Sequence, residues 1–240
     1  MKVNRKDVLG VKVDDVTMDQ ALKTVSGWLK DKGKHYIVTP NPEIIMKAQK
    51  DEELKKILNK AGLAIPDGAG LKLTGDIVCN TPGVDLMEGL IKLGAEKGLT
   101  TGFLGGRDRV AEKCVERLRS RYPNLKISFT DSGGEVNDNG KQVVSSKYPA
   151  TDLLFVAFGP PKQEKWIFKN LAKLDIKVMM AVGGAFDFLS GQVPRAPKWL
   201  RDLDLEWLFR LIIQPWRIKR QLALLKYLWM VVKVRLYDHN

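Results

Sequence analysis

Short apolar runs separated by longer amphipathic segments are the feature that most constrains the fold of this chain. Six such runs have the length and composition of strands. Because helices between strands return the chain to the same end of a sheet, this alternation predicts an α/β fold. Its sheet is expected to be mostly parallel, with helices on both faces. The predicted strands are residues 36–39, 63–66, 102–104, 126–129, 153–158 and 178–182.

The segments around these strands carry helix and turn signals. Thr17 and Gln20 have the spacing of a capping box, which predicts a helix from there to about Leu29. Residues 3–15 alternate weakly around Gly10 and predict a short strand pair. Further helices are predicted over residues 42–61, 84–97, 108–121, 138–147 and 161–173.

The pattern changes at about Pro194. Residues 195–240 contain four of the six tryptophans, and ten Lys/Arg against four Asp/Glu, so they carry +6 of the net charge of +12. Residues 221–236 are predicted to be helical, but their length and charge are wrong for a transmembrane helix. We therefore predict an α/β core over residues 1–194 and a basic helical appendage over residues 195–240.

The net charge of +12 requires an acidic partner: nucleic acid, an anionic membrane or a phosphorylated substrate. A nucleic-acid-binding protein interleaves basic and aromatic residues along a groove. Here the aromatic residues cluster with aliphatic ones in the appendage, which favours a membrane surface and no nucleic acid. The apolar appendage also offers a contact to a second subunit.

Cysteine and histidine usage limits the other chemistry. The polar N-terminus and only two cysteines, Cys79 and Cys114, indicate free thiols in the cytosol. Two histidines are too few for a histidine-rich metal site. Asp202 and Asp204 match a two-aspartate metal motif, but they follow no strand, and we interpret them as solvated helix surface.

Loops that follow parallel strands meet at one edge of the sheet, where such folds bind ligands. The first of them holds Thr39 and Asn41 between prolines, which fix the backbone and present both polar side chains. The alternative is a rigid helix entry with Asn41 as N-cap and Pro42 at N1.

Asp67 follows the second strand and precedes Gly68. An acid there suits a catalytic base or a ribose ligand, although Pro-Asp-Gly is also an ordinary turn. Gly105 ends a strand, where free N–H groups could cradle a diphosphate. Two more such loops contain polar residues, namely Gln163 and Glu164 in one, and Gly184 and Asp187 in the other. A capped helix with solvated charges is the alternative for the loop that contains Gln163 and Glu164.

No glycine-rich dinucleotide-binding fingerprint opens the first strand–helix unit, which disfavours an NAD-dependent oxidoreductase.

Together these segments resemble the WecG/TagA/CpsF family of bacterial glycosyltransferases, in order from about residue 8 to about residue 220. The matching segments are residues 39–41, 66–68, 83–85, 102–106, 159–164, 183–187, 195–199, 206–210, Pro215 and Arg217.

The resemblance implies a Rossmann-like fold and an inverting transfer from a UDP-sugar to a polyprenyl-diphosphate-linked acceptor, without a required metal or other cofactor. The branch that the chain resembles adds N-acetylmannosamine to undecaprenyl-diphosphate-N-acetylglucosamine, an early step of wall teichoic acid synthesis. Other members use N-acetylmannosamine uronic acid or hexoses. The implied location is the inner face of the bacterial cell membrane.

On this resemblance Asp67 is the expected general base, with Asp187 as the rival carboxylate and Thr39 as a catalytic hydrogen-bonding group. Arg210 and Arg217 are expected to stabilise the departing UDP, and the appendage to bring them over the site. The expected substrate-binding residues are Asn41, Gly68, Asp85, Gly105, Gln163, Glu164, Gly184, Asp187, Arg195 and Arg220.

Two segments depart from the family pattern. Residues 75–82 form a shorter loop than usual and lack an arginine that the family carries there. Residues 134–136 read Gly-Glu-Val, where the family often has Gly-Tyr-Phe. We therefore name no site residue in either segment.

Overall fold

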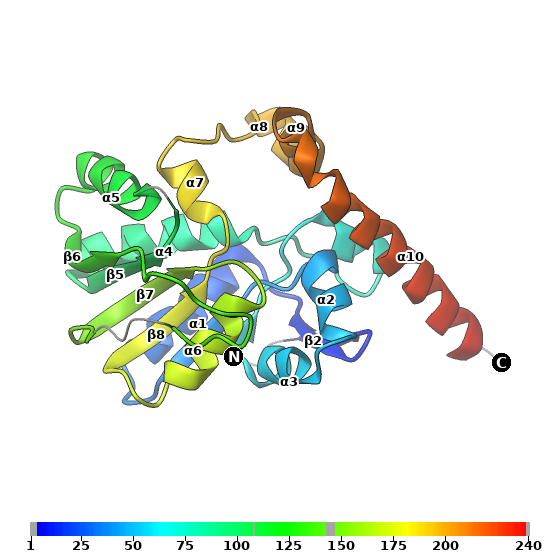
Figure 1. The fold of residues 1–240 in the computed structure, drawn as a ribbon, viewed down its shortest axis with the longest axis horizontal. Helices are drawn as coiled ribbons and strands as arrows, with labels where there is room; N and C mark the ends of the chain where they lie inside the picture. The colour runs from blue at the N-terminus through cyan, green and yellow to red at the C-terminus, as the bar shows by residue number, and fades with distance from the viewer. Residues whose placement is uncertain (1–3, 108, 143–146, 239–240) are drawn as a thin grey trace.

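A computed structural model describes residues 4–107, 109–142 and 147–238 of this chain, and it contains a parallel six-stranded sheet in the order β4-β3-β8-β7-β5-β6. All six predicted strands are confirmed (Figure 1). The predicted strand pair is the antiparallel hairpin of β1 (Arg5–Val8) and β2 (Val11–Asp14). The sheet strands are β3 (His35–Val38), β4 (Leu63–Ala64), β5 (Thr100–Gly105), β6 (Lys126–Asp131), β7 (Thr151–Ala157) and β8 (Ile176–Ala181).

Successive strand residues point to opposite faces of the sheet, and each face has its own apolar core. Leu153 and Phe155 belong to one core, whereas Leu154 and Val156 belong to the other. The first core is covered by α1 (Met18–Trp28), α4 (Gly83–Lys97), α5 (Val110–Arg121) and α7 (Ala185–Leu189). The second is covered by α2 (Pro42–Ala48), α3 (Glu52–Lys60) and α6 (Lys162–Asn170). Helices therefore cover both faces, as predicted.

Two of the predicted helices differ from the structure. The segment 42–61 forms two helices, because the Asp51 side chain accepts a hydrogen bond from the Leu54 N–H at 3.0 Å and starts α3 afresh. The helix predicted over residues 138–147 is wrong for residues 138–142, which form a turn, and residues 143–146 lie outside the described ranges. In this turn the Asn137 side chain accepts from the N–H groups of Asn139 and Lys141, a local alternative to helical hydrogen bonds.

The appendage is helical, as predicted, and it packs on the core. It comprises α8 (Lys198–Asp202), α9 (Glu206–Ile213), the 3-10 turn η2 (Pro215–Arg217) and α10 (Ile218–Asp238). α10 runs along α2 and past the 3-10 segment η1 (Ala69–Thr74) (Figure 1). Tyr227 and Val231 of α10 are buried in the same core as α2. No helix in the described ranges is long and apolar enough to cross a membrane.

Pro215 separates α9 from η2, so Arg210 and Arg217 do not share one continuous helix. The backbone of Arg217 lies in η2 and that of Arg220 in α10. The side chains of both arginines lie outside what the structure describes, and their predicted contacts with UDP stay predictions.

Gln163 and Glu164 begin α6 as a fully buried polar pair. The Gln163 Oε1 accepts hydrogen bonds from the N–H groups of Gly159 at 3.1 Å and Gly183 at 3.0 Å. Its Nε2 donates to Glu164 Oε1 at 2.8 Å. One carboxamide thus joins the loops after β7 and β8. The second Glu164 oxygen has no hydrogen-bond partner among the described residues.

Burial raises the pKa of Glu164 from 4.5 to about 6, against the opposing hydrogen bond from Gln163. Between those two values the folded protein holds a proton that the unfolded chain releases. The free energy of unfolding should therefore fall by about 2 kcal/mol as pH rises through this window. We expect Glu164→Gln to lack this loss, so that its stability relative to wild type rises by that amount between pH 4 and pH 7.5 in urea titrations.

The matched control is Glu116→Gln, which changes an exposed glutamate of α5. Its stability should stay parallel to that of wild type across the same pH range. A Glu164→Gln curve that also stays parallel to wild type would show that Glu164 ionises normally in the folded protein.

Candidate active site

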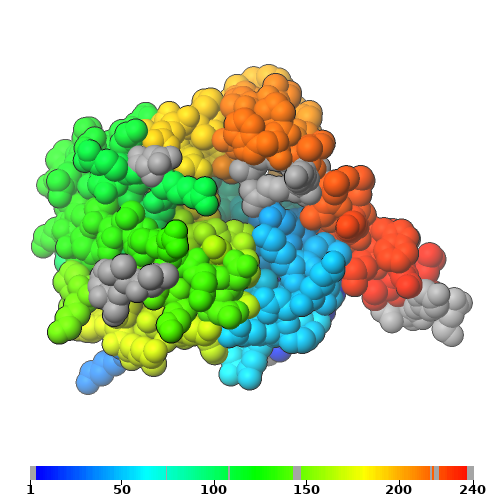
Figure 2. Space-filling view, in the orientation of Figure 1, coloured from blue at the N-terminus to red at the C-terminus, as the bar shows by residue number. Residues whose placement is uncertain are grey.

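The carboxyl ends of five strands open into one cleft of about 1160 Å³. After β5 the chain passes through α5 outward to β6, whereas after β7 it passes through α6 in the opposite direction to β8. Such a reversal opens a crevice between the two strands. α8 and α9 of the appendage bound the cleft on its other side. Figure 2 shows the hollow between the blue segment of α2 and α3, the green and yellow core, and the orange appendage.

The structure brings most of the predicted site residues together. Those that line the cleft are Thr39, Asn41, Asp67, Gly68, Asp85, Gln163, Gly184, Asp187 and Arg210. Gly105, Glu164 and Arg195 are not among the lining residues. Gly105 packs on β7, where an added Cβ would lie 2.8 Å from the Ala157 backbone. The neighbouring Gly106 N–H donates to the Ala157 carbonyl at 3.1 Å, so this predicted diphosphate donor is used within the sheet.

Backbone hydrogen bonds hold Asp67 in place. Its N–H donates to the Pro40 carbonyl at 3.0 Å, and its Oδ1 accepts from the Gly83 N–H at 3.0 Å. The Asn41 side chain also donates to the Asp67 carboxylate. Asn41 Oδ1 accepts from the Ile44 N–H at 3.0 Å, which makes Asn41 the N-cap of α2. The predicted N-cap is thus confirmed, and the cap also turns the amide toward Asp67.

The environment of Asp67 raises the pKa of its carboxyl group above the usual 3.8. Burial is the main cause, and the negative charge of Glu206 adds to it. The Gly83 N–H, the Arg210 charge and the Asn41 amide act in the opposite direction. Two of these influences, Glu206 and Arg210, come from α9 and stand one helical turn apart.

The Arg210 guanidinium lies in the cleft, next to the loop and short helix that follow β8. Its Nη2 lies 3.9 Å from Asp187 Oδ2, and its Cζ lies 4.3 Å from the centre of the Phe188 ring. A Cβ at Gly184 would lie 2.9 Å from Arg210 Nη2, so glycine provides the space for this approach. Sequence reasoning missed Phe188, because an aromatic residue in a short apolar helix gives no sign of the arginine that it faces.

Arg195 is an internal ion-pair partner in this structure. Its guanidinium binds both oxygens of Asp85 and both oxygens of Glu206, with Nε 3.0 Å from Glu206 Oε1. These contacts raise the pKa of Arg195 against the effect of its burial. They connect α4 to α9, and so fix the appendage over the strand ends.

The interpretation of Asp202 and Asp204 as solvated helix surface was wrong for Asp204. Asp204 lies beyond the end of α8 with φ at 60°, and it accepts from Lys72 Nζ at 2.7 Å and Asn80 Nδ2 at 2.8 Å. These partners lower the pKa of Asp204 against the effect of burial. Asn80 Oδ1 in turn accepts from the Gly68 N–H at 3.0 Å, which ties the Asp67 loop to the appendage. Asp202 is exposed, as expected.

Besides Arg210, three cations line the cleft, Lys72, Arg107 and Arg201, and sequence reasoning named none of them. Lys72 is paired with Asp204. Arg107 follows the Gly105–Gly106 turn, where its position after a strand-end glycine pair was a usable signal. Arg201 lies on α8, and only the fold of the appendage brings it to the cleft. Among the described residues, no group of three or more His, Cys, Asp or Glu has the arrangement of a metal site.

Comparison with known proteins identifies the family of this chain. The model of the glycosyl transferase WecG/TagA/CpsF family matches residues 6–240. An N-acetylglucosaminyldiphosphoundecaprenol N-acetyl-beta-D-mannosaminyltransferase of Bacillus subtilis (strain 168) is 35% identical over 216 residues, covering 83% of each chain. A protein of the same name from Staphylococcus aureus (strain MRSA252) is 31% identical over 237 residues, covering 95% of this chain and 92% of the relative. The chain therefore belongs to the WecG/TagA/CpsF family of glycosyltransferases.

Proposed function

We propose that this protein transfers N-acetylmannosamine from UDP-N-acetylmannosamine to undecaprenyl-diphosphate-linked N-acetylglucosamine, with inversion to a β-1,4 linkage, early in wall teichoic acid synthesis. The names of its relatives support the donor sugar and the acceptor. The observation that carries the proposal is Asp67, a carboxylate with a raised pKa held at a strand end in the cleft, beneath the arginine of the appendage.

Asp67 acts as the general base. It takes the proton of the acceptor hydroxyl while that oxygen bonds to the anomeric carbon from the face opposite UDP. The bond from the anomeric carbon to the diphosphate oxygen breaks, and UDP leaves with the electron pair. General-base assistance of this kind is typically worth about 10²–10⁴ in rate. A raised pKa brings the base closer to neutral pH, where proton transfer is more effective.

The departing diphosphate requires fixed positive charge and hydrogen-bond donors. Arg210 is positioned for this, since Phe188 and Asp187 hold its guanidinium at the cleft. Its planar fork suits two phosphate oxygens. We assign Arg217 and Arg220 to the same diphosphate, following the resemblance. No metal is needed in this scheme.

The other predicted residues divide into two groups. Thr39, Asn41, Gly68, Gly184 and Asp187 line the cleft, and we assign them to substrate contacts. Asp85 and Arg195 pair with each other, and Gln163 binds Glu164 and two backbone N–H groups. We assign these residues, with Gly105, to shaping the site.

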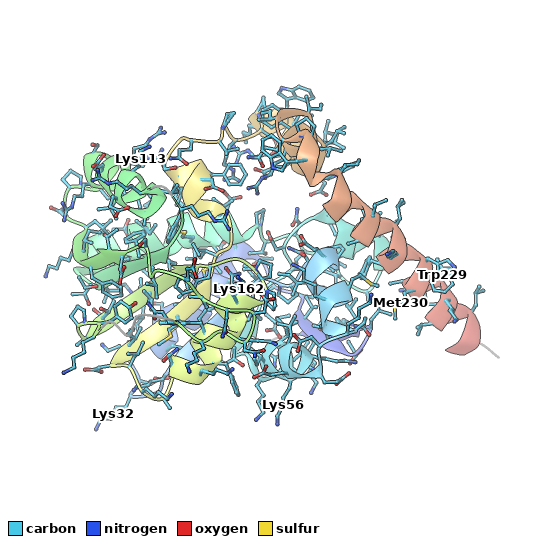
Figure 3. The ribbon with its side chains drawn as sticks, viewed as in Figure 1. Lys32, Lys56, Lys113, Lys162, Trp229 and Met230 are labelled. Atoms are coloured by element: carbon cyan, nitrogen blue, oxygen red, sulfur yellow. The ribbon has the colours of Figure 1, made fainter. Side chains whose placement is uncertain are left out.

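The outer face of α10 is our proposed membrane contact. Leu225 and Trp229 belong to an exposed apolar stripe, and Lys233 Nζ lies 5.1 Å above the Trp229 ring. Figure 3 shows Trp229 on the side of α10 away from the core. Apolar residues among lysines suit an anionic bilayer surface, here the inner face of the cell membrane. The stripe is Ile218, Leu222, Leu225, Trp229, Val232 and Leu236.

The transfer is tested by measuring UDP release from a panel of UDP-sugars with a short-chain lipid-diphosphate-N-acetylglucosamine. We expect UDP-N-acetylmannosamine to be the preferred donor. Asp67→Asn should lose about 10²-fold or more in kcat but keep its affinity for UDP, because only the base is removed. Preference for N-acetylmannosamine uronic acid or a hexose would reassign the donor, and near-normal turnover of Asp67→Asn would move the base to Asp187.

The pH dependence of kcat/KM tests the two charges of α9 that act on Asp67. Activity should fall on the acid side as Asp67 becomes protonated. Glu206→Gln removes a charge that raises the pKa of Asp67, so its acid limb should move to lower pH. Arg210→Ala removes a charge that lowers this pKa, so its limb should move to higher pH. This arrangement would be contradicted if the acid limbs of the two variants stayed at the wild-type pH, or if both moved in the same direction.

Membrane binding is tested by sedimentation with anionic vesicles. The double variant Leu225→Gln/Trp229→Gln keeps the net charge, and we expect most of its binding to be lost because it removes apolar contact. The control Lys113→Gln/Arg119→Gln removes two charges from α5, far from α10, and should bind nearly as wild type. Binding that is kept in Leu225→Gln/Trp229→Gln but lost in the α5 control would indicate unspecific charge attraction. Salt-sensitive binding to bare DNA instead of vesicles would favour a nucleic-acid-binding protein.

A further inference from the structure

Arg201 is a cation of the cleft that no group among the described residues neutralises. The other appendage arginines with described side chains near the cleft are paired, Arg210 with Asp187, and Arg195 with Asp85 and Glu206. The Arg201 guanidinium has no ion pair or hydrogen bond with any described residue, and its Nε is buried.

A buried N–H donor without a partner costs about 1–3 kcal/mol, and more when the group is charged. The carboxylates nearest in sequence do not offset this cost. Asp202 is exposed, and Asp204 is held by Lys72 and Asn80. An unpaired guanidinium that faces a cleft is therefore most simply explained by an anionic ligand that the chain itself does not supply.

The geometry of α8 indicates which anion this is. Trp199 and Leu203 are 63% and 62% exposed, whereas Arg201 lies between them and lines the cleft. Two helical positions correspond to a rotation of about 200°, so Arg201 faces away from both apolar side chains. α8 thus has the cleft on one side and an outward apolar surface on the other.

We propose that Arg201 binds the diphosphate of the lipid-linked acceptor, a role that rests on the proposed function. Two diphosphates enter this cleft, one on each substrate. The donor diphosphate leaves beside Arg210, near Asp67. The acceptor diphosphate continues into an apolar chain, which must leave the cleft beside apolar surface, and α8 provides both a guanidinium and that surface. The fork of Arg201 matches two oxygens of a diphosphate.

The test compares full-length wild type, Arg201→Gln and Arg201→Lys in the transfer assay, varying each substrate in turn. We expect Arg201→Gln to raise KM for the lipid-linked acceptor about tenfold or more, with KM for the UDP-sugar within about twofold of wild type. Arg201→Lys should lie between them, because lysine keeps the charge but not the fork. Arg119→Gln, an exposed arginine of α5, is the matched control and should leave both constants unchanged.

Thermal unfolding separates ligand binding from a structural role. Arg201→Gln removes no hydrogen bond or ion pair with a described residue, so its Tm should be equal to or above that of wild type. A Tm lower by several degrees, an unchanged acceptor KM, or a raised KM for the UDP-sugar alone would each overturn the proposal.

Vesicle binding distinguishes failure of this inference from failure of the proposed function. Anionic vesicles with and without undecaprenyl-diphosphate-N-acetylglucosamine are sedimented with each protein. Wild type should bind the diphosphate-containing vesicles more tightly, and Arg201→Gln should lose only this difference. If wild type transfers no sugar but shows the difference, the proposed function fails while the Arg201 site stands. If neither protein responds to the lipid diphosphate, the Arg201 site is wrong.

Discussion

The hydrogen bond from the Gly83 N–H to Asp67 Oδ1 is the contact on which the site depends. It joins the loop after β4 to the first turn of α4, and it fixes one oxygen of the carboxylate. The Asp67 N–H is held by Pro40, whose loop follows the neighbouring strand β3. Backbone groups at the rigid edge of the parallel sheet therefore position the Asp67 carboxylate. Its position does not depend on mobile side chains.

The appendage completes the electrostatics of this carboxylate. Glu206 and Arg210 act on Asp67 in opposite directions, and both belong to α9. Their positions are set by contacts far from Asp67, namely Arg195 with Asp85, and Asp204 with Lys72 and Asn80. A substitution in these outer contacts can thus change the protonation of Asp67 without touching it.

The sequence was sufficient to predict what the parallel sheet determines. Thr39, Asn41 and Asp67 follow apolar strands directly, so the rule that strand ends meet at one edge placed them together. Contacts that depend on chain segments folding back were not predictable in this way. Arg201 and Phe188 gave no local signal, since their roles arise from where α8 and α7 lie. The turn at Asn137 was missed because a side chain there competes with helical hydrogen bonds, which periodicity alone does not reveal.

α10 has a buried side and an exposed apolar stripe, and this division has a thermodynamic consequence. Tyr227 and Val231 pack on the core, while Leu225 and Trp229 face outward, so the two contacts use opposite sides of one helix. A partner that binds the exposed stripe removes no contact between the buried side of α10 and the core. The two contacts therefore do not compete for the same atoms. A flat surface that receives the outer stripe would also fix the rotation of the helix about its axis. Through the shared helix it would set the direction in which the mouth of the cleft faces.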